Sequence, residues 1–94
     1  MKIVINTRPG GFDLSDKALK MYHVATQTKV HAWEIERDDT VLVGIVNHLG
    51  KQADGPYANL KIIEVPDNIE YYIMEDFGVE TIHECHRTWG DTTT

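Results

Sequence analysis

Three arginines stand at the ends of segments that we expect to form strands or helices: Arg8, Arg37 and Arg87. A guanidinium group can donate two parallel hydrogen bonds to one phosphate or carboxylate, so arginine in a loop is well suited to binding an anion. If the fold brings the three ends together, they would frame an anion pocket with Gly10 and Gly11. The alternative is that Arg37 pairs with nearby carboxylates and Arg87 with one of the strand glutamates.

The glycine pair lies between an apolar run at residues 3–5 and a capped helix start at Asp13 or Ser15. A strand, a glycine loop and a helix N-terminus in this order direct backbone N–H groups and the positive end of a helix dipole toward one place. The loop has neither a G-x-G-x-x-G pattern nor a G-K-[ST] ending. The loop therefore implies no standard dinucleotide or triphosphate site, and we expect no cofactor.

The two tryptophans, Trp33 and Trp89, are candidates for stacking against a base or another flat ring. Trp89 is the stronger candidate because Arg87 lies two residues before it and could add a cation–π contact. The usual alternative for a tryptophan in a small domain is a place in the hydrophobic core. We include Trp89 among the candidate ligand-binding residues and expect Trp33 to be buried.

Metal-binding side chains are densest at His83, Cys85 and His86. On a strand the first two point to one face and His86 to the other, so the three would not converge on one ion. We therefore expect no metal site and no cysteine–histidine catalysis. Cys85 is the only cysteine, which excludes an internal disulfide and fits a reducing compartment.

Two pairs of carboxylates could act as acid and base in an enzyme: Asp13 with Asp16, and Asp38 with Asp39. Each pair also lies where a helix is expected to begin, and capping the helix explains it without catalysis. We therefore name no catalytic residue. An enzyme acting on a phosphorylated or nucleotide substrate stays open as an alternative.

Length and charge limit the possible functions further. The 94 residues, of which 41% are hydrophobic, predict one domain, with residues 90–94 a frayed tail. The formal charge of −6 argues against direct binding of nucleic acid. We interpret this excess as scattered over an ordinary solvated surface, with an acidic mimic of nucleic acid as an alternative. The sequence has neither a signal peptide nor an apolar run long enough to span a membrane, so we expect a cytoplasmic protein.

Hydrophobic periodicity predicts the elements that must position these residues. We expect an α+β fold in the order β-α-β-α-β-β-β, with a mixed sheet and two helices on one face. The first two strands would be parallel neighbours joined by the first helix, and the last three a meander. An apolar second face could be covered by a homodimer. The expected strands are 2–6, 29–35, 60–65, 69–73 and 79–86, and the expected helices are 14–27 and 39–49.

Four stretches resemble a family of small phage-encoded proteins, most of them hypothetical proteins. The stretches are MKIVINTRPGGFDLS, IERDDTVLVGIVNHLG, YANLKIIEVPDNIEYYI and HRTW, and together they cover most of the chain. The chain departs from the family pattern at Pro9 and in residues 26–29. The resemblance implies action in the cytoplasm of an infected cell but supplies no catalytic residues.

These observations together favour a binding protein over an enzyme. We expect stoichiometric association with a host protein or a small anionic, nucleotide-like ligand, in host takeover or counter-defence. The candidate ligand-binding residues are Arg8, Gly10, Gly11, Arg37, Arg87 and Trp89.

Overall fold

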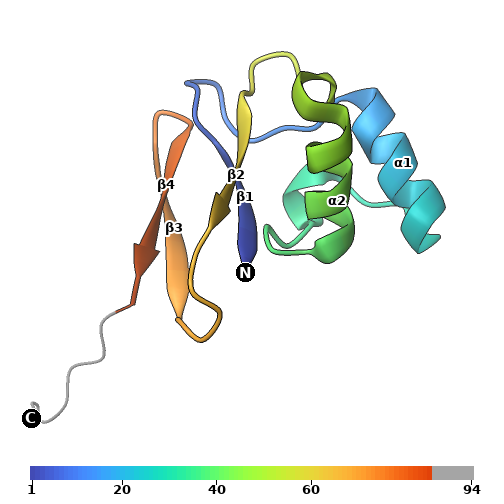
Figure 1. The fold of residues 1–94 in the computed structure, drawn as a ribbon. Coiled ribbons are helices and arrows are strands. Elements are labelled where there is room, and N and C mark those ends of the chain that lie inside the picture. Colours follow the sequence, from blue (N-terminus) through green and yellow to red (C-terminus); the bar gives the residue numbers. More distant parts are fainter. Residues whose placement is uncertain (86–94) are drawn as a thin grey trace, which may run out of the picture.

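The computed structural model describes residues 1–85 and confirms the α+β class (Figure 1). Two α-helices and two antiparallel sheets of two strands each form the described part of the chain. Two short 3₁₀ turns, η1 and η2, complete it. In chain order the elements are β1 (Lys2–Asn6), α1 (Asp16–Thr26), η1 (Ala32–Glu34), α2 (Thr40–Leu49), η2 (Gly50–Ala53), β2 (Leu60–Glu64), β3 (Tyr71–Asp76) and β4 (Val79–Glu84).

The first sheet pairs β1 with β2, from Lys2 opposite Glu64 to Asn6 opposite Leu60. β1 is buried, with almost no exposed surface at Ile3, Val4 and Ile5. β-branched residues such as these favour a strand. α2 packs against both strands and α1 packs on α2, so the two helices lie on the same side of this sheet, as expected (Figure 1).

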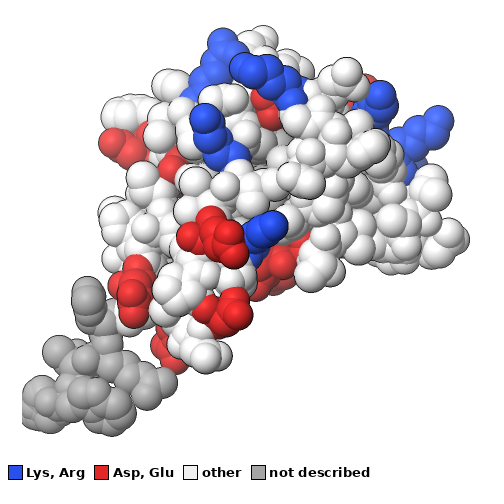
Figure 2. Space-filling view, viewed as in Figure 1, with Lys and Arg blue, Asp and Glu red and all other residues white. Residues whose placement is uncertain are grey.

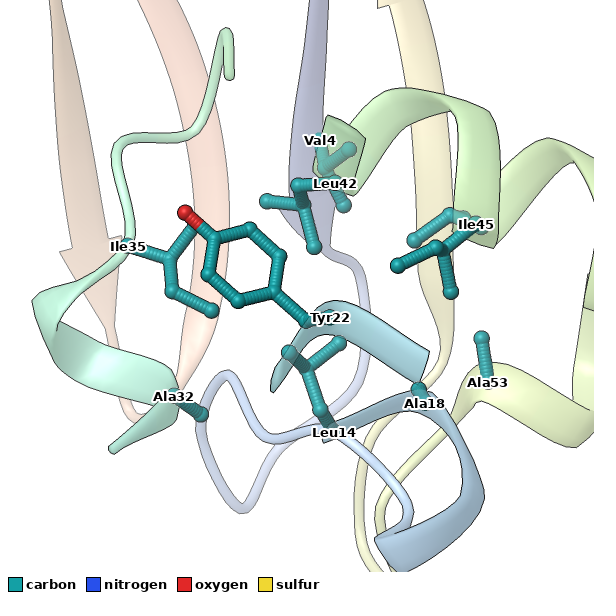
Figure 3. Packing of buried hydrophobic residues seen from close by; sticks show 10 residues of the cluster. Val4, Leu14, Ala18, Tyr22, Ala32, Ile35, Leu42, Ile45 and Ala53 are labelled. Carbon is teal, nitrogen blue, oxygen red and sulfur yellow. The ribbon is translucent and has the colours of Figure 1, made fainter. Parts of the chain in front are cut away.

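The core lies between this sheet and the two helices (Figure 3). Tyr22 of α1 is at its centre, with its ring among aliphatic side chains from several elements. Its hydroxyl donates a hydrogen bond of 2.8 Å to Asp39 Oδ2, which gives the one polar atom of the ring a partner. The other members of the cluster are Val4, Leu14, Ala18, Ala32, Ile35, Leu42, Ile45, Val46 and Ala53.

Both helices begin at capping residues that the sequence indicates. Ser15 Oγ accepts from the Ala18 amide at 3.1 Å, so Ser15 rather than Asp13 is the N-cap of α1. Asp39 Oδ1 accepts from the amides of Val41 and Leu42 at the start of α2. Asp39 thereby caps one helix and holds the Tyr22 hydroxyl of the other.

The expected strand at residues 29–35 is wrong, because its central residues form the 3₁₀ turn η1. The Glu34 carboxylate accepts from the His31 amide at 2.7 Å, which closes the turn locally. A strand here would have needed the free edge of β1, and that edge is occupied: the Val4 amide donates to the Arg37 carbonyl at 2.9 Å. The parallel crossover therefore does not form, and the first sheet is antiparallel rather than mixed.

The three C-terminal extended runs are present as β2, β3 and β4, but they do not form one meander. β2 pairs with β1, whereas β3 and β4 pair only with each other in the described residues. Their two-residue turn has positive φ at both Phe77 (53°) and Gly78 (90°), as in a type I′ hairpin. The second sheet is thus a hairpin that extends beside the body (Figure 1).

Tyr22 allows a prediction about alkaline unfolding. Its hydrogen bond to Asp39, with burial and the nearby carboxylate charge, raises the pKa of the Tyr22 hydroxyl. The unfolded chain therefore loses this proton first, and stability falls as pH rises from about 10 through the folded pKa. We expect Tyr22→Phe to cost about 1 kcal/mol at pH 7 through the lost hydrogen bond, and clearly less at pH 11. Urea unfolding at both values tests this, and an equal loss at both would contradict it.

Candidate functional site

Arg37 forms a bidentate ion pair with a carboxylate far away in the chain. Its two terminal nitrogens lie 2.5 and 2.8 Å from the two carboxylate oxygens of Glu80 on β4. The Glu80 side chain is only 6% exposed, and the guanidinium carbon lies 3.6 Å from the centre of the Phe12 ring. Arg37 is therefore engaged in an ion pair, as the alternative predicted, but the predicted nearby partner is wrong: Glu80 lies 43 residues away in the sequence.

The same pair occupies the edge of β1 that faces away from β2. Val4 and Asn6 direct their backbone groups to this edge, because their neighbours pair with β2. The Asn6 amide donates to Glu80 Oε1 at 2.8 Å, and an Arg37 nitrogen donates to the Val4 carbonyl at 3.4 Å. The Arg37 carbonyl accepts from the Val4 amide. The Arg37–Glu80 ion pair and the Arg37 carbonyl thus bond the backbone groups of β1 that a third strand would otherwise bond.

The glycine loop is covered by the turn of the hairpin. The buried Asn6 side chain donates to the carbonyls of Arg8 and Gly78, at 2.6 and 2.7 Å. A Cβ atom on Gly78 would overlap the amide nitrogens of Gly10 and Gly11, so the turn passes directly over that part of the loop. These glycines therefore permit a close backbone contact, and their N–H groups do not face an open anion site.

The start of α1 does not join the glycines in one site either. Leu14 forms an isolated bridge with Asp54 between the loop and the helix. The N-cap Ser15 also donates its hydroxyl proton to the Gln52 carbonyl at 2.6 Å. The helix N-terminus is therefore built into the contact with η2.

The predicted pocket residues thus divide into three groups. Gly10, Gly11 and Arg37 do lie in one region, but as parts of the joint between the body and the hairpin. Arg8 is exposed, and no described residue pairs with its guanidinium group. Arg87 and Trp89 lie outside the described residues, so their role as ligand-binding residues stays a prediction.

The other candidates also have defined places. Trp33 is 75% exposed, with its ring stacked on that of His31 at 4.2 Å, so the expectation that it belongs to the core is wrong. The His83 ring stacks on Tyr72 and lies 2.8 Å from the Thr81 hydroxyl. Within residues 1–85 no group of three histidine, cysteine or carboxylate side chains could hold a metal ion.

Three exposed large hydrophobic residues, Tyr72, Met74 and Phe77, lie together on the outer face and tip of the hairpin. The register aligns Tyr72 with His83, Met74 with Thr81 and Asp76 with Val79, so all six side chains share one face. A hollow of about 560 Å³ lies over this face. We call this surface the hairpin face; it consists of Tyr72, Met74, Asp76, Phe77, Val79, Thr81 and His83, with Pro9 at its margin.

The opposite face of the hairpin points toward the body. Glu80 on this face is buried in the ion pair, and Tyr71 lies near the charged turn at residues 36–38. Burial, with the nearby carboxylates of Asp38 and Glu36, raises the pKa of the Tyr71 hydroxyl. The hairpin is therefore two-sided, with one face attached to the body and the other turned outward.

We interpreted the acidic excess as scattered over the surface, but it is concentrated in one part of the chain. Residues 62–85 contain seven aspartates and glutamates and no lysine or arginine, while residues 1–61 contain seven acidic and eight basic residues. Figure 2 shows the acidic side chains mainly toward the hairpin and the β2–β3 turn, and the basic ones mainly over the opposite part of the molecule. The distribution could have been found in the sequence, and it assigns the negative charge to the hairpin and the segment before it.

The ion pair gives a prediction about stability. We expect Glu80→Ala to cost about 3 kcal/mol or more, because it leaves the largely buried Arg37 without its partner and the Asn6 amide without an acceptor. The double variant Arg37→Met, Glu80→Leu should lose less than the sum of the losses from Arg37→Met alone and Glu80→Leu alone. Denaturant unfolding of these three variants, beside Glu80→Ala, tests this coupling. Additive losses would show that the pair is not a unit.

The contact over the glycine loop gives a second prediction. Gly78→Ala should both strain the turn and push the hairpin away from the loop. Gly11→Ala is the matched control, since it also has positive φ but its Cβ would meet nothing within 4 Å. We expect Gly78→Ala to be the more destabilising by about 1 kcal/mol or more. Equal losses in thermal or urea unfolding would mean that the close contact contributes nothing.

No helix among the described residues is long and apolar enough to cross a membrane. No protein-family model, curated protein or solved structure matches this chain.

Proposed function

We propose that this chain is a binding protein that associates stoichiometrically with a basic protein partner through the hairpin face. The observation that carries the proposal is Phe77, whose side chain is 87% exposed at the tip of the hairpin. Phe77 also has positive φ (53°), where asparagine, aspartate or glycine is normally found. A bulky residue with this backbone conformation costs stability, and such costs are typical of binding sites.

The surroundings of Phe77 fit a protein interface. Tyr72 and Met74 are about half exposed on the same face, and aromatic residues and methionine are enriched at the centres of interfaces. Together with Phe77 and the hollow that Met74 helps to line, they offer anchors of the kind that supply most of the binding energy in protein complexes. Soluble proteins seldom leave such a group exposed unless a partner covers it.

Charge indicates the chemistry of the partner. The hairpin carries Glu70 and Asp76 on the face of the apolar residues and Glu75 and Glu84 on the other, and no lysine or arginine lies in residues 62–85. A basic surface would be attracted to this hairpin and oriented on it before the apolar contacts form. A small anionic ligand is the less supported alternative, because the donors of Arg37 that could bind it are engaged by Glu80.

An acidic mimic that blocks a nucleic-acid-binding protein is the second candidate function, and the concentrated charge of residues 62–85 favours it. A pure mimic would depend on carboxylates and hardly on Phe77. The resemblance to small phage-encoded proteins supports a host protein in the cytoplasm of an infected cell as the partner in either case. The alternative of a small enzyme has no arrangement of side chains in its favour among residues 1–85.

Phe77→Asn separates stability from binding. Asparagine adopts positive φ with less strain, so we expect this variant to unfold at higher denaturant, by roughly 1 kcal/mol. The same variant should lose affinity for the partner by about tenfold or more, as expected when an aromatic anchor is removed. Trp33→Ala, which removes another exposed aromatic ring outside the hairpin, is the matched control and should keep full binding.

Affinity capture from lysate of a bacterial host, with wild-type protein and both variants as bait, measures the effect. The proposal requires one basic protein that is recovered at a ratio near one to one by the wild type and by Trp33→Ala, but not by Phe77→Asn. A double variant, Asp76→Asn with Glu84→Gln, serves as a further bait. If Phe77→Asn still recovers the protein and only the double variant loses it, the result favours the acidic mimic. If no protein is captured by Trp33→Ala and lost by Phe77→Asn, the binding role of the hairpin face is overturned.

A further inference from the structure

We infer that the outer edge of β3 accepts an extended basic segment of the partner as an added antiparallel or parallel strand. This inference rests on the proposed function, since it specifies how the partner engages the hairpin. Its starting point is the backbone of β3, which directs some of its hydrogen-bonding groups away from β4.

The alternation of hydrogen-bonded and non-hydrogen-bonded residue pairs along the hairpin identifies these groups. The Cys85 amide donates to the Glu70 carbonyl at 2.8 Å, so Glu70 and Cys85 form a hydrogen-bonded pair. The alternation of an antiparallel ladder then makes Tyr72 and Met74 bond to β4. Tyr71, Ile73 and Glu75 therefore turn their backbone N–H and C=O groups outward, and no backbone partner for them is found among residues 1–85.

Among residues 1–85 each of the other strand edges is at least partly engaged by the rest of the chain. The free edge of β1 is closed by Arg37 and Glu80. On β2 the first outward amide, that of Leu60, donates to the Asp54 side chain at 3.0 Å, and Lys61 discourages pairing with another strand. β4 turns toward β1, where its Glu80 is buried.

By contrast, β3 has no proline, lysine or bulge along its six residues. Its residues Met74, Glu75 and Asp76 are exposed. A two-stranded hairpin is marginally stable without further packing, so a third strand would also stabilise the element that receives it. Main-chain hydrogen bonds to an open edge are an established way to bind a peptide segment.

Charge disfavours a second copy of this chain as the occupant. Pairing two β3 edges would bring Glu70, Glu75 and Asp76 close to the same residues of the copy, and like charges across a strand pair are destabilising. A segment with lysine or arginine at alternate positions would instead place its charges on the face of Glu75, where Glu80 and Glu84 of β4 also lie. Its apolar residues could then extend the hairpin face next to Tyr72 and Met74.

A defined peptide tests the edge directly. The probe is a capped hexapeptide of alternating lysine and valine, matched in length to β3, and the control is the same peptide with glutamate in place of lysine. Residue-resolved amide hydrogen exchange is measured by NMR at low salt on the full chain. We expect the lysine peptide to slow exchange at Ile73 by about tenfold or more, and to slow exchange at Tyr72 and Met74 by less. The glutamate peptide should have no effect.

Binding of the lysine peptide without slower exchange at Ile73, or equal slowing by both peptides, would overturn the inference. Self-association of the protein with protection at Ile73 would also overturn it, in favour of a second copy. Phe77→Asn should still pair with the lysine peptide, although it should fail to capture the partner. A partner that depends on Phe77 but leaves the Ile73 amide unprotected would therefore refute strand addition and leave the proposed function intact.

Discussion

The ion pair between Arg37 and Glu80 connects the two halves of this molecule. It holds the edge of β1, fixes the turn before α2 and anchors the hairpin through its only buried carboxylate. A charged pair so little exposed is favourable only when its hydrogen bonds are well made. Here both oxygens of Glu80 are engaged by Arg37, and one also accepts from the Asn6 backbone. The requirement to satisfy these groups limits where the hairpin can lie.

This joint leaves the two halves with different physical characters. The body has an aliphatic core around Tyr22, covered by two capped helices, and its acidic and basic residues nearly balance. The hairpin has no core of its own and contributes Glu80 inward and an apolar face outward. The core that favours folding lies in the body. Residues of the hairpin can therefore be chosen for binding even where they lower the stability of the fold. Phe77, with its positive φ, is such a residue.

Part of the fold could be predicted from local pattern. The run Ile3-Val4-Ile5, the amphipathic helices and the turn at Asp76-Phe77-Gly78 each depend on neighbours in the sequence, and each is where the pattern indicated. The prediction of a strand at residues 29–35 was wrong because alternation of polar and apolar residues is also compatible with an irregular segment on the surface. Whether such a segment becomes a strand depends on an available edge, and the edge of β1 was already taken by Arg37.

The sequence by itself determined the fold class, the two helices and the segregation of acidic residues into 62–85, because these follow from local propensity and composition. Only the tertiary structure decided that Arg37 pairs with Glu80, 43 residues away, rather than facing a ligand. It likewise decided that the glycine pair accommodates Gly78 and that Phe77 and the edge of β3 face outward. The physical reason is that burial and pairing arise from contacts between distant segments, which residue type and spacing along the chain do not specify.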